Sequence, residues 1–204
     1  MTITYPLSVP TSPKPRKSRL LLRSKVGTAE STFTFSTQKQ DHACQRWEID
    51  YELPPMTASQ AGAWIAFMCS LNGAKGTALV PEPDRTAALG VATGTPIVDG
   101  GSQTGNVLLT KGWTGNTAGI LLAGDYIQVG SYMYMVLKTV ASETGGSASL
   151  DIMPALRSSP TASASITTSN VKTLMRLSTN EMAWSTDELK HYGLSMSFIE
   201  ELPS

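Results

Sequence analysis

The sequence lacks an excess of charge of either sign, and charged residues are few. Among 204 residues, 16 are basic and 16 are acidic, so the formal net charge is zero. Charged residues make up 16% of the chain, below the roughly 25% typical of soluble domains. Nucleic-acid-binding proteins usually carry a basic excess, because neutralising phosphates supplies much of their affinity. The composition therefore fits a protein whose surface is covered by neighbours, or a secreted β protein, better than a nucleic-acid binder.

Long apolar runs are also missing. No run of about 18 apolar residues occurs, so we expect no membrane-spanning helix. The N-terminal segment has prolines where a signal peptide would need an apolar core, so we expect no secretion signal. Hydrophobic residues still make up 41% of the chain, which is enough to build one large domain or two small ones.

Cysteine is scarce, with only Cys44 and Cys69 present. No framework spacing indicates a disulfide, and we expect two buried free thiols in a reduced intracellular protein. The two histidines, His42 and His191, are expected at the surface or in hydrogen bonds. A zinc site usually needs three or four closely spaced ligands, so these four residues do not predict one.

Recognised catalytic patterns are missing as well. The chain has no nucleophile elbow, no phosphate-binding loop and no dinucleotide fingerprint. Glu48, Asp50 and Glu52 lie on one face of an expected strand, and two of them could act as a carboxylate pair in glycoside hydrolysis. A solvated strand face or a polar subunit interface explains them more simply. We therefore expect no enzymatic activity and no bound cofactor or metal.

The clearest pattern present is a strict period-2 alternation over residues 45–53, which predicts a β-strand with two different faces. The apolar face carries Trp47, Ile49, Tyr51 and Leu53. The polar face carries Arg46, Glu48, Asp50 and Glu52, which we take as a candidate subunit interface. Earlier strands are expected at 19–25 and 31–37, joined by a linker at 26–30 that contains Gly27.

A single helix is predicted over residues 57–72. Thr57 is a suitable N-cap residue, and Gln60 three positions later completes a capping box. Trp64, Met68 and neighbouring apolar residues recur at helical spacing. Asn72 and the following glycine supply a stop, because they adopt the left-handed conformation at little cost.

The rest of the chain predicts further short strands around a change of composition. Residues 1–16 contain four prolines and are expected to form an extended arm or a disordered tail, and not a central strand. Residues 84–118 are rich in glycine, threonine and asparagine. Strands are expected at 77–81, 95–98, 106–110, 125–129, 132–140, 148–153, 163–168, 172–177, 181–185 and 191–199. The strand at 132–140 is apolar on both faces, which is typical of a core strand or an interface.

Two segments resemble known proteins. The strand RWEIDYEL, which leads through two prolines into TASQAGAWIAFMCSLNGAKG, resembles the distal tail protein of long-tailed (siphovirus) bacteriophages. The segment AGDYIQVGSYMYMVLKTVASETGGSASLDIMPALR at 123–157 resembles a small β module of phage tail and baseplate proteins. Together they cover about half of the chain.

The resemblance implies a mainly β architecture in three parts. Residues 1–16 would form the N-terminal arm. Residues 17–82 and 165–204 would form a ring-forming β-barrel hub domain with one α-helix. Residues 83–164 would form an inserted small β-barrel of OB or SH3-like type, in which Trp113 covers a three-stranded meander.

The resemblance also implies a function in assembly. Such proteins form a homohexameric ring at the distal end of the tail tube, in a virion assembled in the cytoplasm of the bacterial host. The implied partners are the tail tube protein, the tail hub and tape-measure proteins, and receptor-binding or tail-fibre proteins, with DNA only as transient cargo of the lumen and no membrane. Two alternatives remain: a tail tube or tail-completion subunit, and a carbohydrate-binding β module in which Trp113 or Trp184 stacks on sugars.

Overall fold

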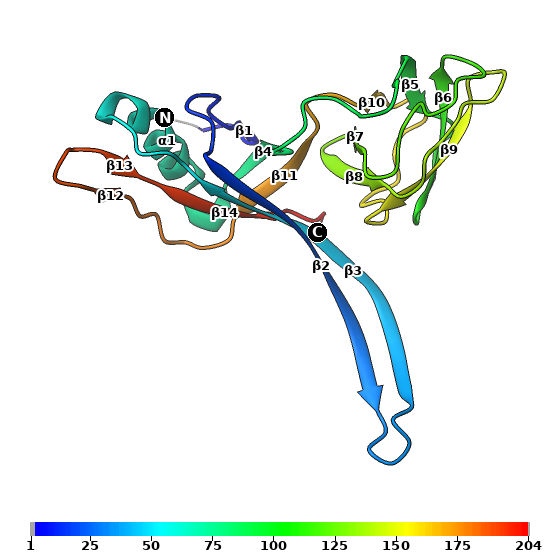
Figure 1. Ribbon diagram of the computed structural model, residues 1–204, viewed down its shortest axis with the longest axis horizontal. Coiled ribbons are helices and arrows are strands. Elements are labelled where there is room, and N and C mark those ends of the chain that lie inside the picture. Colours follow the sequence, from blue (N-terminus) through cyan, green and yellow to red (C-terminus); the bar gives the residue numbers. More distant parts are fainter. Residues whose placement is uncertain (1–2, 204) are drawn as a thin grey trace.

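Two six-stranded sheets, each with its own hydrophobic core, account for most of the chain (Figure 1). The computed structural model describes residues 3–203, apart from the side chains of residues 41–43. The chain is mainly β, with 43% strand and 9% helix, as the sequence predicts. His42 lies among the side chains that are not described.

The first sheet has the order β1-β4-β11-β14-β3-β2. Its strands are β1 (Leu7–Ser8), β2 (Lys17–Glu30), β3 (Thr37–Glu52), β4 (Thr77–Pro81), β11 (Lys172–Leu177) and β14 (Ser195–Glu200). β1 pairs with β4 in parallel, and the other pairs are antiparallel. The proline-rich arm thus contributes only a short edge strand, because proline cannot donate to a central ladder.

The second sheet has the order β10-β7-β8-β9-β6-β5 and is nearly closed into a barrel. Its strands are β5 (Gly94–Val98), β6 (Val107–Trp113), β7 (Tyr126–Val129), β8 (Tyr132–Val136), β9 (Ala148–Met153) and β10 (Ile166–Thr167). The two edges meet where Ile97 bridges Ser165, and the Val98 N–H donates to the Ala164 carbonyl at 2.9 Å. Closure leaves few free strand edges on this barrel.

The helix α1 (Ala58–Leu71) covers one face of the first sheet, where the apolar face of β3 is buried. It begins as predicted: the Gln60 side-chain oxygen accepts a hydrogen bond from the Thr57 N–H at 3.1 Å. It ends at Asn72 in the left-handed conformation, followed by a 3-10 turn η1 (Gly73–Lys75). With 14 residues, α1 falls short of the length and apolarity that crossing a bilayer requires, and no other described helix is longer.

Strand β8 joins the two cores. Tyr134 and Val136 point into the barrel, whereas Met133 packs into the core of the first sheet. The Trp47 indole N–H of β3 donates to the Met133 carbonyl at 3.0 Å, and its ring meets Tyr126 edge-on at 6.0 Å. A strand apolar on both faces is needed here because each face belongs to a different core.

Several local predictions are wrong. Residues 26–30 belong to β2, and residues 31–36 are the turn that follows it, so the strand expected at 31–37 is absent and Thr37 is the first residue of β3. Phe33 and Phe35 alternate with threonine as in a strand, but no core lies beside them. β10 pairs with β7 in the second sheet, so the expected return to the first domain at residue 165 is too early.

The later strands are shorter than predicted. The pair β12 (Ser185–Thr186) and β13 (Tyr192–Gly193) forms a small ribbon of its own, where a longer strand was expected at 181–185. The expected strand at 132–140 ends at Val136. The prediction of buried thiols is also wrong, because both cysteines are exposed. Cys44 lies on a part of β3 that has no core, and Cys69 lies on the solvent side of α1.

Candidate functional site: a projecting hairpin and a cavity under the arm

The hairpin of β2 and β3 projects far from the body of the molecule (Figure 1). The two strands pair from Lys17 to Glu30 of β2, with one register shift between Lys25 and Val26, but β14 supports β3 only between Glu48 and Glu52. In the described chain, the outer part of the hairpin is therefore a two-stranded ribbon, and β2 is exposed from Arg23 to Glu30. An isolated two-stranded hairpin is marginally stable in water, so a ribbon of this length is expected to gain support from a neighbour.

The hairpin tip (residues 31–36) presents two aromatic side chains to solvent. Phe33 is 93% exposed and Phe35 is 76% exposed. The turn is held by backbone hydrogen bonds of 2.9 Å from the Ser31 N–H to the Ser36 carbonyl and from the Phe35 N–H to the Ser31 carbonyl. Phe35 has a φ of 53°, a left-handed conformation that bulky residues seldom adopt. Large apolar side chains in this setting are typical of contact surfaces.

The polar face of β3 is paired within the chain. Glu48 accepts hydrogen bonds from the Arg23 Nε at 2.6 Å and from the Arg46 Nε at 3.0 Å. The hydrogen bond from Arg23 is the main reason why the pKa of Glu48 falls to about 2. Further along the strand, Asp50 lies 3.9 Å from Arg19.

The same row of charges ends at Glu52, which pairs with Arg16 at the end of the arm. The hydrogen bond from Arg16 lowers the pKa of Glu52. Arg46, Glu48, Asp50 and Glu52 thus lie together on one face, as predicted, and the structure adds arginine partners from β2 and the arm. Exposed pairs of this kind contribute little stability each. Whether this face is a subunit interface stays a prediction.

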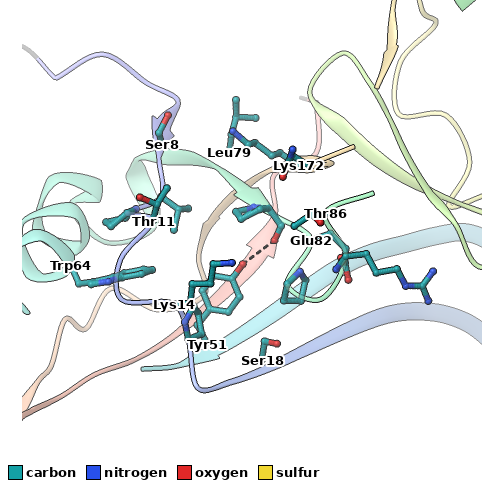
Figure 2. Close-up of a pocket in the computed structure, with 17 residues that line it drawn as sticks. Ser8, Thr11, Lys14, Ser18, Tyr51, Trp64, Leu79, Glu82, Thr86 and Lys172 are labelled. Atoms are coloured by element: carbon teal, nitrogen blue, oxygen red, sulfur yellow. Dashed lines mark hydrogen bonds between the residues drawn. The ribbon is translucent and has the colours of Figure 1, made fainter. Parts of the chain in front are cut away.

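A cavity of about 410 Å³ lies between the N-terminal arm and the body (Figure 2). The arm is fixed in place, because the Tyr5 hydroxyl donates to the Ser70 carbonyl at 2.7 Å and β1 pairs with β4. The sequence did not predict this cavity, since its walls come from segments far apart in the chain. We call it the arm cavity, and its lining includes Val9, Pro10, Lys14, Tyr51, Trp64, Leu79, Glu82, Pro83, Arg85 and Lys172.

The inner wall of the arm cavity is aromatic. Trp64 is fully buried, and its indole N–H has no hydrogen-bond partner among the described residues. The Tyr51 hydroxyl donates to the Pro81 carbonyl at 2.8 Å. Burial, and then the charge of Glu82, raise the pKa of Tyr51, so this hydroxyl keeps its proton. The wall can therefore pack against apolar groups without adding a charge.

The other residues singled out in the sequence lie apart from both features. Trp113 is buried in the barrel core and donates to the Thr110 hydroxyl at 2.8 Å, so it cannot serve as a sugar platform. Trp184 is 46% exposed and borders an open cavity of about 450 Å³. His191 pairs with Asp187 at 3.5 Å in an exposed loop. Within the part of the chain that the structure describes, no group of three or more His, Cys, Asp or Glu side chains could hold a metal ion.

No protein-family model matches the chain, and no curated protein matches it significantly.

Proposed function

We propose that the protein is a structural virion protein that forms a ring at the distal end of a phage tail tube and connects it to the hub and receptor-binding apparatus. The observation that supports this most is the long hairpin, which has no core of its own and ends in exposed aromatic residues. Such an element fits a protein that is completed by its neighbours. The mainly β fold and its single described α-helix agree with the resemblance of residues 46–76 and 123–157.

In this proposal the subunits contact one another in a head-to-tail manner, and rotation closes the ring. The polar face of β3 would meet a neighbour along the row that ends at Glu52. Because its charges are already paired within the chain, this face would set the orientation of the subunits more than their affinity. The proposed further contacts are with the tail tube, the hub and tape-measure proteins, and receptor-binding proteins. DNA would pass only through the lumen.

Negative-stain electron microscopy and light scattering of the purified protein test this proposal. We expect rings of about sixfold symmetry, or their formation when tail tubes are added. A strict monomer that never joins tubes or particles would contradict the ring. Long filaments made of the protein alone would favour the alternative of a tail tube subunit.

A second candidate function is carbohydrate binding, which the exposed Trp184 favours. Its indole borders an open cavity that also contains Arg16 and Glu52, a combination of aromatic and charged groups suited to sugars. Glycan addition should then quench tryptophan fluorescence, and Trp184→Ala should remove the quenching. Leu189→Ala, a change at another exposed residue of the same ribbon, should not alter the quenching. Equal quenching in the wild type and in Trp184→Ala would exclude this site.

A further inference from the structure

The hairpin tip carries a conformational cost that a single chain does not explain. A left-handed φ at a phenylalanine is unfavourable, and the residue that fits that position best is glycine. Phe35 and Phe33 make no core contact that would compensate, since both are exposed. Backbone strain of this kind is commonly found at binding sites. The tip is therefore shaped to present two aromatic side chains to something outside the chain.

The arm cavity has the chemistry to receive them. Its apolar lining combines aromatic rings and prolines, including Tyr51, Trp64, Pro10 and Pro83. Aromatic side chains pack edge-to-face or offset against such rings and gain more than their buried area alone provides. A volume of about 410 Å³ lies at the lower end of the range for ligand pockets.

The charges of the two features are complementary. The cavity lining contains three cationic residues, Lys14, Arg85 and Lys172, against one carboxylate, Glu82. Between residues 27 and 38, the hairpin carries one charged side chain, Glu30. Lys25 and Lys39 lie further from the turn, so Glu30 is the charged group nearest to the two phenylalanines. An attraction between Glu30 and a cationic side chain of the cavity, such as Lys14, would help to orient the tip.

The tip cannot fill the cavity of its own chain. The hairpin extends away from the body, whereas the cavity lies on the body beside α1 and the arm (Figure 1, Figure 2). A knob and a hole at different places on one molecule form a heterologous contact, which repeats from copy to copy until a ring closes or a filament grows. We propose that the arm cavity receives the hairpin tip of a second copy of this chain, with Phe33 and Phe35 as its anchors. This inference rests on the proposed function, because it takes self-assembly as given.

Site-directed disulfide formation tests the contact. In a Cys44→Ser, Cys69→Ser background, Thr34→Cys, which keeps both phenylalanines, combined with Thr11→Cys on the cavity lining should give cross-linked dimers and larger species on mild oxidation. Thr34→Cys combined with Leu89→Cys serves as the control, since Leu89 is 60% exposed but lies outside the cavity. Equal cross-linking in both pairs, or none in the first, would overturn the inference.

Loss of the anchors should weaken assembly without affecting the fold. Phe33→Ser with Phe35→Ser should reduce self-association at least tenfold, as measured by light scattering and ring counts. Leu89→Ser with Val91→Ser removes two other apolar side chains, each 60% exposed, and should leave assembly unchanged. Circular dichroism should match the wild type in both cases.

A charge exchange gives an independent test. Lys14→Glu should weaken association, and Glu30→Lys in the same chain should restore it. If this rescue fails and the phenylalanine variant assembles normally, the contact between the tip and the arm cavity is excluded. The ring proposal then still holds, provided that the wild type forms rings. A wild type that stays monomeric at all concentrations and never joins tubes would instead refute the proposed function itself.

Discussion

The ion pair between Arg157 and Glu200 is expected to be the most costly pair in the molecule to break. Arg157, which follows β9, donates from its guanidinium to the Glu200 carboxylate at 3.0 and 2.6 Å. Both side chains are nearly inaccessible to solvent. The Glu200 carboxylate also accepts a hydrogen bond from the backbone N–H of Trp47 at 2.9 Å. The pair therefore ties the barrel to β14, which carries Glu200, and to β3, which carries Trp47.

The change to make is Arg157→Met, which keeps most of the aliphatic stem and removes the charge. A buried carboxylate left without its partner costs about 3–5 kcal/mol. The matched control is Arg176→Met. Arg176 pairs with Glu201 at 2.7 Å, but about a third of each side chain is exposed, so its loss should cost at most about 1 kcal/mol.

Urea denaturation followed by circular dichroism measures both effects. With a slope of about 2–3 kcal/mol per molar, Arg157→Met should lower the midpoint by about 1–2 M. Arg176→Met should shift it by less than about 0.5 M. Equal shifts for the two variants would refute the view that burial makes the first pair different. Because Arg157 links the two sheets, we also expect its loss to separate the unfolding of the barrel from that of the first sheet.

Three further predictions concern single positions. Gly146→Ala should destabilise the protein by more than about 2 kcal/mol in the same urea titration, because φ is +75° and a Cβ would overlap a backbone carbonyl. Gly145→Ala is the control and should be nearly neutral, since a Cβ there would meet open space. The hydrogen bond from Arg23 lowers the pKa of Glu48 to about 2. The stability that the ionised Glu48 adds to the fold is therefore complete above about pH 4.5 and is lost as the pH falls through 2. Hydrogen exchange at the base of the hairpin should accelerate over that window in the wild type and not in Glu48→Gln. The free energy of unfolding of Phe35→Gly should exceed that of Phe35→Ala by about 1 kcal/mol in thermal denaturation, since only glycine adopts the left-handed φ without cost. A more stable alanine variant would contradict this.

The parts of the fold that depend only on residues close together in the sequence are predictable from it. The strand at 45–53 and the helix at 57–72 follow from local periodicity and capping, and both are present. The tip was misread because Phe33 and Phe35 alternate with threonine, and alternation does not reveal whether a core lies beside the strand. The short β10 was misassigned because its partner is chosen by barrel closure and not by its own residues.

The candidate site was predictable only in part. The row of charges on β3 follows from its alternation, but the arginine partners depend on the register between β2 and β3, which the turn at 31–36 sets. The arm cavity depends on where the proline-rich arm lies against α1 and β4. No local pattern encodes such a contact between segments more than 60 residues apart, like that of Tyr5 with Ser70.

Strand β3 also has a mechanical consequence. It runs as one strand from the hairpin tip into the body. There, Trp47 contacts β14 of the first sheet through its backbone amide, and β8 and β7 of the barrel through its indole N–H and its ring. A force applied at the tip would therefore travel along one continuous backbone and arrive at the joint between the first sheet and the barrel. Because the hairpin is long compared with that joint, it acts as a lever, and small rotations at Trp47 correspond to large displacements of Phe33.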